Sequence, residues 1–422
     1  MHWVIANPGS IPELLRLAEH LDSSGDRVTY ITPLGWTARA GEQGPGARML
    51  GKGIREGLRR RTPALTRPGQ RVRRRATALE LGYLLARRLG LTSLREVLLS
   101  RRNVAFDRAV SRCLNQDVDA LVVRSTACIR SLRRARALGV LTVLDAPIMH
   151  QRSLSDLLAR EAAAFPSLSD SLVDLKAEAV AESLDRELDQ ADIIIALSNA
   201  HAHSFVENGV DSTRLLLAPL GVDTELFAFR PRPSRVAEHP PQVLFVGQIT
   251  QRKGLAYLIN AMDLVRQAQP DVILKLVGSA HGDILSQLPP YVVWHDAVAR
   301  EHLAAHYHQA DVFAFLSLAE GFAQTPLEAM ACGLPVVMSR QAYGPDGPVR
   351  DGVEGFVLDA RDVGGVAAKI VQLLADEATR QGMGAAAASR AREFTWERFA
   401  GKVRRDVLTV LAKRRSTSHG TR

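Results

Sequence analysis

The chain has 422 residues, of which 46% are apolar and 5% aromatic, and it carries a net charge of +9. That length exceeds what one hydrophobic core usually serves, so we expect two domains. No apolar run approaches the roughly 18 residues of a membrane-spanning helix, and the amino-terminal sequence lacks the basic lead of a signal peptide. The three cysteines (Cys113, Cys128 and Cys332) form no CxxC pair, which favours reduced thiols in the cytoplasm.

Strands and helices alternate through residues 1–228. Short apolar runs predict strands, and segments with apolar residues three or four apart predict helices between them. The predicted strands are 3–7, 27–32, 120–125, 141–146, 192–198 and 214–223, and the predicted helices include 11–26, 78–90, 105–117, 127–138 and 199–211. Such βαβ units indicate a parallel sheet.

One segment makes the chain basic. Residues 51–102 hold fifteen Lys or Arg against three Glu, a net charge of +12, so the rest of the chain sums to −3. We treat 48–103 as a basic insertion that is either solvated surface or a surface for anionic lipid headgroups or a phosphorylated acceptor. Tyr83 is its single aromatic residue, which disfavours a specific nucleic-acid partner.

A second alternation follows a proline-rich linker at 229–242. Its predicted strands are 243–247, 272–278, 291–295, 311–317, 335–339 and 355–360, and these near-continuous apolar runs are typical of strands covered on both faces. The fold class is therefore α/β, with two doubly wound, Rossmann-like domains at 1–228 and 243–390 and a cleft between them. Ligands of such sheets bind beyond the carboxyl ends of the strands.

Two cations follow the first strand of the second domain. Arg252 and Lys253 precede Gly254 on a loop that this rule places on the ligand rim. An arginine fork and a lysine point charge suit a diphosphate. A solvated loop is the alternative for so short a basic pattern.

The stretch AEGFAQTPLEAMACGLPVV (319–337) brings two carboxylates to the same rim. Thr325 as N-cap, Pro326 at the first helical position and Glu328 two positions later fit a capping box, which explains Glu328 without a ligand. The amides of the same helix start are an anion site, Gly321 permits close backbone approach, and Glu320 can accept from vicinal hydroxyls. Together these features predict a nucleotide-sugar site.

The second half of the chain resembles the retaining GT-B glycosyltransferases of family four (group 1). The resemblance rests on Glu320-x7-Glu328 with VLFVGQITQRKG and VRDGVEGFVL, and on ADIIIALSNAHAHSFVENGVDSTRLLLAPLGVDTELF, and it covers roughly residues 191–399. It implies the GT-B fold, retaining sugar transfer from a nucleotide-diphosphate donor to an acceptor, no essential metal or other cofactor, and a terminal helix at 391–412 that crosses back to the first domain.

The resemblance also implies roles for single residues. Arg252 and Lys253 would bind the donor diphosphate and Glu320 the donor sugar, with the Gly321 and Phe322 amides nearby, while Glu328 would bind the ribose. The remaining donor-site and catalytic-face residues that we assign on this basis are Gly247, Ala323, Thr325, Val298 in the base loop 295–298, and His150 in the first domain.

The sequence departs from the family pattern at two places. Gln248 stands where many relatives have arginine, a charge that Arg252 could supply, and the first-domain glycine loop is reduced to Asn7–Ser10. His150 fits a satisfied histidine as well as a catalytic one. The alternatives to a transferase are a sugar-nucleotide epimerase on the same fold and a non-catalytic sugar-nucleotide-binding protein anchored by the basic insertion.

Overall fold

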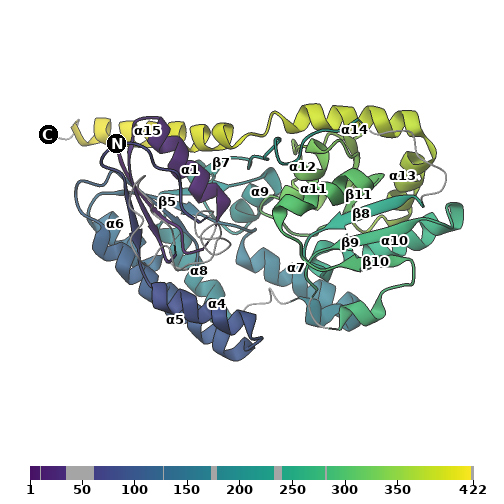
Figure 1. Ribbon diagram of the computed structural model, residues 1–422. Helices are drawn as coiled ribbons and strands as arrows, with labels where there is room; N and C mark the ends of the chain where they lie inside the picture. Colours follow the sequence, from purple (N-terminus) through teal and green to yellow (C-terminus); the bar gives the residue numbers. More distant parts are fainter. Residues whose placement is uncertain are drawn as a thin grey trace, which may run out of the picture.

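The computed structural model describes residues 1–9, 11–34, 61–126, 128–172, 178–231, 240–280 and 283–419. Two parallel sheets, each flanked by helices, form two lobes that lie side by side (Figure 1). This arrangement confirms the predicted pair of doubly wound α/β units.

The first lobe is built on a seven-stranded parallel sheet in the order β3-β2-β1-β4-β5-β6-β7. Ile5 of β1 lies between Tyr30 of β2 and Val122 of β4, and all three side chains are buried. The strands are β1 (His2–Ala6), β2 (Arg27–Thr32), β3 (Arg71–Arg74), β4 (Ala120–Arg124), β5 (Leu141–Asp145), β6 (Ile193–Ala196) and β7 (Leu215–Leu217).

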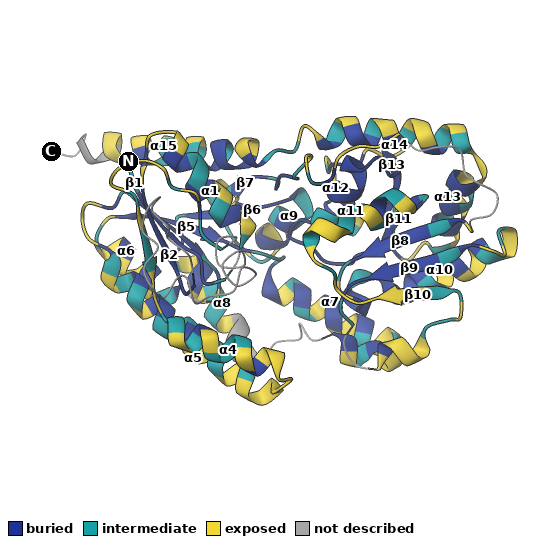
Figure 2. Cartoon of the chain, in the orientation of Figure 1, coloured by how far each residue is buried: buried dark blue, intermediate teal, exposed yellow. Residues whose placement is uncertain are grey.

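Helices cover both faces of this sheet, because its strands are apolar on both sides. They are α1 (Pro12–Ser23), α4 (Thr77–Arg88), α5 (Thr92–Cys113), α6 (Ile129–Ala137), α7 (Gln151–Ala164), α8 (Glu178–Gln190) and α9 (Asn199–Glu207), with the short helices η1 (Pro166–Ser171) and η2 (Ser212–Arg214). In Figure 2 the sheet is almost entirely buried, whereas the far end of the α4–α5 hairpin is exposed.

The second lobe has a six-stranded parallel sheet in the order β10-β9-β8-β11-β12-β13. Its strands are β8 (Gln242–Val246), β9 (Ile273–Val277), β10 (Val292–His295), β11 (Val312–Phe315), β12 (Val336–Ser339) and β13 (Gly355–Leu358). Its helices are η3 (Gln251–Lys253), α10 (Leu255–Ala268), η4 (Ile284–Gln287), α11 (Arg300–Gln309), α12 (Gln324–Ala331), η5 (Arg340–Ala342), α13 (Val363–Ala375) and α14 (Glu377–Ala391).

The last helix, α15 (Trp396–His419), returns to the first lobe and packs against α1 (Figure 1). Arg404 Nε lies 2.7 Å from Asp26 Oδ2, and Arg415 Nη2 lies 2.7 Å from Asp119 Oδ1. The helix begins later and extends further than the 391–412 expected from the sequence. It thereby connects the end of the second lobe to the first.

The basic insertion differs most from its sequence prediction, and its residues 48–60 lie outside the described part of the chain. Residues 71–74 form the edge strand β3, which the sequence analysis missed because RVRR has no apolar alternation. Helix α5 begins at Thr92, well before the predicted start at residue 105, and pairs with α4. The described part of the insertion is thus an edge strand followed by a helical hairpin.

Candidate functional site

Two cations and one carboxylate meet at the carboxyl end of the second sheet. Lys253 Nζ contacts Glu320 Oε1, and Arg252 Nη1 lies 3.8 Å from the same oxygen. Arg252 Nη1 also donates to the Ala319 carbonyl at 2.8 Å. The structure therefore brings together the three side chains that the sequence analysis assigned to the diphosphate and the sugar. We refer to Arg252, Lys253 and Glu320 as the donor cluster.

Glu320 is buried and ionised. Its Oε1 also accepts from the Ser317 hydroxyl. Burial opposes ionisation, but the charges of Lys253 and Arg252 and these hydrogen bonds outweigh it and hold the pKa of Glu320 below its ordinary value. The cluster therefore carries two positive charges and one negative charge, and its cations are fixed in place before any ligand arrives.

Two glycines allow the loops of the cluster to come close to their neighbours. Gly254 has a left-handed φ of 76°, and a Cβ there would lie 2.1 Å from the Leu316 carbonyl oxygen. A Cβ on Gly321 would lie 2.3 Å from the carbonyl oxygen of Pro147, which belongs to the first lobe. The loop that carries Glu320 thus touches the other lobe directly.

The capping-box interpretation of Glu328 is wrong. Helix α12 begins at Gln324 with Ala323 as N-cap and no side-chain cap, so Thr325 and Pro326 lie inside the first turn. Glu328 instead accepts from Arg300 Nη2 and from the Tyr307 hydroxyl, both at 3.0 Å. Burial raises the pKa of Glu328, and the charge of Arg300 opposes that shift. Glu328 is thus a buried carboxylate that two donors from α11 hold in place.

The other assigned residues of the second lobe lie around the donor cluster or on the neighbouring loops. Phe322 packs edge-on against Tyr343, with ring centroids 4.8 Å apart, and the Tyr343 hydroxyl donates to the Ala323 carbonyl. Gly247 directly follows β8, and its amide donates to the Val277 carbonyl at 3.0 Å. Val298 is half-buried on the loop between β10 and α11. Gln248, at the place of the missing arginine, accepts from Arg252 Nη2 at 3.4 Å.

His150 has a structural role that accounts for it. It is the N-cap of α7, where its Nδ1 accepts from the Arg152 amide at 3.3 Å, and its Nε2 lies 3.2 Å from Asp185 Oδ1. Only 4% of its surface is exposed, and burial lowers its pKa. A catalytic role for His150 therefore stays a prediction.

A second histidine, which the sequence analysis did not single out, holds the loop that faces Gly321. The Leu197 amide donates to His201 Nδ1 at 3.0 Å, so Nε2 carries the proton and donates to the Ile148 carbonyl at 2.9 Å. Complete burial lowers the pKa of His201 to about 4. The neutral imidazole thus fixes the position of the 147–149 loop.

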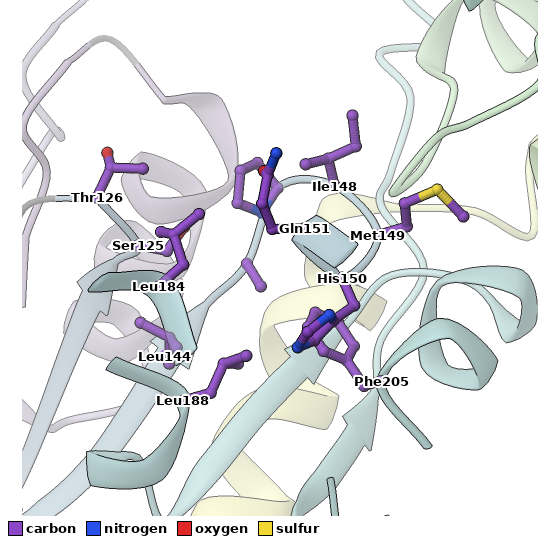
Figure 3. A pocket seen from close by; sticks show the side chains of 12 residues that line it. Ser125, Thr126, Leu144, Ile148, Met149, His150, Gln151, Leu184, Leu188 and Phe205 are labelled. Carbon is purple, nitrogen blue, oxygen red and sulfur yellow. The ribbon is translucent and has the colours of Figure 1, made fainter. Parts of the chain in front are cut away.

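A small cavity of about 50 Å³ lies beyond the carboxyl ends of β4 and β5, next to this loop (Figure 3). Thr126 at its edge has a φ of 82°, a conformation that is costly for a β-branched residue. Glu187 holds the strained turn by accepting from the Thr126 amide at 2.7 Å. The cavity is lined mainly by Ser125, Thr126, Leu144, Ile148, His150 and Phe205. Pro147 and Ile148 of the loop that faces Gly321 contribute to its wall.

The first-lobe rim also holds a buried charge cluster. Arg124 Nη1 lies 2.6 Å from Glu13 Oε1 and 2.5 Å from Asp145 Oδ2. Asp145, the last residue of β5, is therefore an ion-pair partner of Arg124. Burial and the neighbouring Asp145 raise the pKa of Glu13.

Sequence reasoning missed the residue that ties the first lobe to the donor cluster. Glu161 of α7 is 2% exposed and accepts from Gln251 Nε2 at 2.8 Å, from Tyr257 at 3.0 Å and from Arg361 Nη2 at 2.6 Å. Gln251 directly precedes Arg252, and its own amide donates to Ser171 at 3.0 Å. Since these partners lie far apart in the chain, no local pattern could have shown this network.

The fold and the site define a two-lobed α/β protein in which two cations and a buried carboxylate lie on a loop region that contacts the first lobe. Residues 240–376 match the family described as glycosyl transferases group 1. This match confirms the resemblance found in the sequence for residues 240–376, and the chain has the GT-B architecture.

Two curated relatives illustrate the match. The D-inositol 3-phosphate glycosyltransferase of Pseudarthrobacter chlorophenolicus is 35% identical over 239 residues, which cover 51% of this chain and 55% of that protein. The GDP-mannose-dependent alpha-(1-6)-phosphatidylinositol monomannoside mannosyltransferase of Mycolicibacterium smegmatis is 33% identical over 226 residues, 48% of this chain and 58% of that protein. The chain thus spans little more than half the length of the curated relatives it matches.

Solved structures share the fold over nearly the whole chain. The sucrose-phosphate synthase of Thermosynechococcus elongatus matches with a TM-score of 0.60 at 20% identity, covering 97% of this chain and 100% of that one. The Anabaena protein HepE in complex with UDP-glucose matches with a TM-score of 0.58 at 18% identity, covering 98% and 100%. At these identities the likeness shows the fold alone.

Proposed function

We propose that this protein is a retaining glycosyltransferase that moves a sugar from a nucleotide-diphosphate donor to a hydroxyl of an acceptor. The observation that carries the proposal is the donor cluster: two cations fixed against a buried carboxylate, on a loop that touches the first lobe. Curated relatives of the second half of the chain are named as glycosyltransferases, one of them GDP-mannose-dependent.

Departure of the diphosphate is the step that requires electrostatic stabilisation, because negative charge grows on the leaving oxygen. Arg252, Lys253 and the amides at the start of α12 would stabilise that charge from fixed positions. Glu320 would accept from hydroxyls of the donor sugar, and Glu328 from the ribose. Attack by the acceptor hydroxyl from the face that the diphosphate leaves would retain the anomeric configuration.

The test is nucleotide release from a panel of UDP-, GDP- and ADP-sugars offered with polyol and lipid-linked acceptors. Release that depends on an acceptor, with a product of retained configuration by NMR, supports the proposal. Epimer formation without an acceptor would establish the epimerase alternative, and binding by calorimetry without turnover would establish the non-catalytic one. Lys253→Ala serves as the inactive control.

We further propose that the reaction needs no divalent cation, since Arg252 and Lys253 supply the positive charge at the diphosphate. Saturating EDTA should then leave the rate unchanged. A loss of activity that Mg²⁺ restores would refute this part of the proposal.

We also propose that the acceptor is met at the anionic inner face of a cytoplasmic membrane. The net charge of +12 on residues 51–102 supports this, at about 1 kcal/mol for each cation near such a surface. Among the described residues, no helix has the length and hydrophobicity to cross a bilayer. Contact with the membrane would therefore occur at the protein surface.

A further inference from the structure

The α4–α5 hairpin exposes an unusual share of the large apolar side chains. In the described part of the chain, fourteen such side chains are exposed, and half of them lie between residues 81 and 104. Their exposed fractions range from 45% to 61%, and they are Leu81, Leu85, Leu89, Leu91, Leu94, Val97 and Val104. Scattered single leucines need no explanation, but a continuous group on one element does.

These side chains form stripes along the helices. Leu81, Leu85 and Leu89 are four residues apart and so share one face of α4 and its carboxyl end. A neighbouring side of α4 packs on α5, where a Cβ on Gly82 would lie 3.5 Å from Leu98 Cδ1. The leucine stripe is therefore exposed to solvent and is separate from the side of α4 that packs on α5. A helix that only faced water would carry polar residues there.

Helix α5 carries an outward stripe in which apolar and cationic residues alternate. Leu94, Val97, Arg101, Val104 and Arg108 recur three or four residues apart, and all five are exposed. Arginines beside an exposed aliphatic stripe can extend their charged groups to lipid phosphates while the aliphatic side chains enter the membrane interface.

The acidic residues of the hairpin are turned inward, with one exception. Glu80 lies 3.6 Å from Arg102 and is 4% exposed, and Asp107 is buried where it accepts from the Ser131 amide at 2.8 Å. Glu96 is the one exposed acid between residues 77 and 113, whereas Arg88 is exposed beside the α4 stripe. The outward surface is thus apolar and cationic.

We propose that the α4–α5 hairpin is a membrane-docking element for an anionic bilayer. Its aliphatic stripes enter the boundary between headgroups and acyl chains, while Arg88, Arg101 and Arg108 bind lipid phosphates. A nucleic acid would engage the arginines but leave the leucines in water, and a second copy of the chain would bring arginines face to face. The hairpin projects from the first lobe on the side away from α15 (Figure 1). A role for this docking in catalysis rests on the proposed sugar transfer at a membrane, whereas the vesicle-binding test does not depend on that transfer.

The test measures co-sedimentation of the full chain with phosphatidylcholine vesicles, with and without phosphatidylglycerol, at low and high salt. The L81Q/L85Q/L89Q variant keeps every charge, and it should lower the partition coefficient on anionic vesicles at least ~10-fold at both salt concentrations. The R88Q/R101Q/R108Q variant should lose the preference for anionic vesicles and the salt dependence.

The control variant replaces three exposed aliphatic side chains elsewhere, V206Q/L264Q/V353Q, and should bind vesicles like the wild type. Thermal unfolding and UDP or GDP calorimetry on each variant show that the fold and the donor site are intact, which separates failure here from failure of the proposed transferase. The inference is overturned if the leucine variant binds vesicles as strongly as the wild type does. It is also overturned if the wild type is a dimer in ultracentrifugation and the leucine substitutions dissociate that dimer, because the face would then bind a second copy of the chain.

Discussion

Replacing Lys253 with alanine should reduce both stability and turnover, and a second substitution separates the two effects. The Lys253 side chain is 13% exposed and its Nζ contacts Glu320, which is 10% exposed. Without the lysine, the buried carboxylate faces only Ser317 and the more distant Arg252 at 3.8 Å. Removing one partner of a buried ion pair costs about 3 kcal/mol, mainly because the remaining charge is left unpaired.

The double variant Lys253→Ala/Glu320→Gln removes that unpaired charge. We expect chemical denaturation to show most of the lost stability restored, by about 2 kcal/mol relative to the single variant. Nucleotide release should fall by about 10²–10³-fold in the single variant, as for loss of one transition-state donor. It should stay low in the double variant, which also lacks the Glu320 carboxylate proposed to bind the donor sugar.

Lys369→Ala provides the matched control. Lys369 of the same lobe rests on the Phe356 ring at 4.4 Å, as Lys253 rests on Phe315 at 5.4 Å, but it has no buried carboxylate partner in the contacts described. Equal unfolding free energies for Lys253→Ala and Lys369→Ala would show that the ion pair contributes nothing. Turnover that returned in the double variant would show that Lys253 acts only through the fold.

Further predictions concern three other buried groups. Glu161→Ala should lower the unfolding free energy by about 2 kcal/mol and weaken nucleotide binding in calorimetry, because Gln251 loses its hydrogen-bond acceptor. A loss of stability with unchanged nucleotide affinity would confine the role of Glu161 to packing. Glu161→Gln should have a smaller effect on both quantities. Glu328→Gln can still accept from Arg300 through its amide oxygen, but its amide nitrogen must then donate to the Tyr307 oxygen, and the charge paired with Arg300 is lost. We therefore expect about 1 kcal/mol of destabilisation and a roughly tenfold weaker donor affinity; unchanged affinity would exclude the ribose role. For His201, the unfolded chain takes up a proton below the ordinary pKa of 6.5 while the folded protein stays neutral until about pH 4. Stability should therefore fall by up to about 3 kcal/mol as the pH drops through that interval, and less in His201→Gln; parallel pH profiles would refute this.

The sequence by itself determined both sheets apart from the edge strand β3, and the place of the donor cluster. Apolar runs separated by helical segments specify parallel strands, and parallel strands put every loop at their carboxyl ends on one rim. Arg252, Lys253 and Glu320 follow two such strands, so their meeting could be predicted without knowing any contact between them.

Only the tertiary structure decided which partners the buried polar groups have. Glu328 fitted a local capping pattern, yet it turns to Arg300 and Tyr307 on another helix. Glu161 crosses to the second lobe, and the exposed leucines of α4 have the same spacing as a buried face would. Local sequence specifies which side of an element is apolar or charged, but the surface that meets that side is set by packing between segments far apart in the chain.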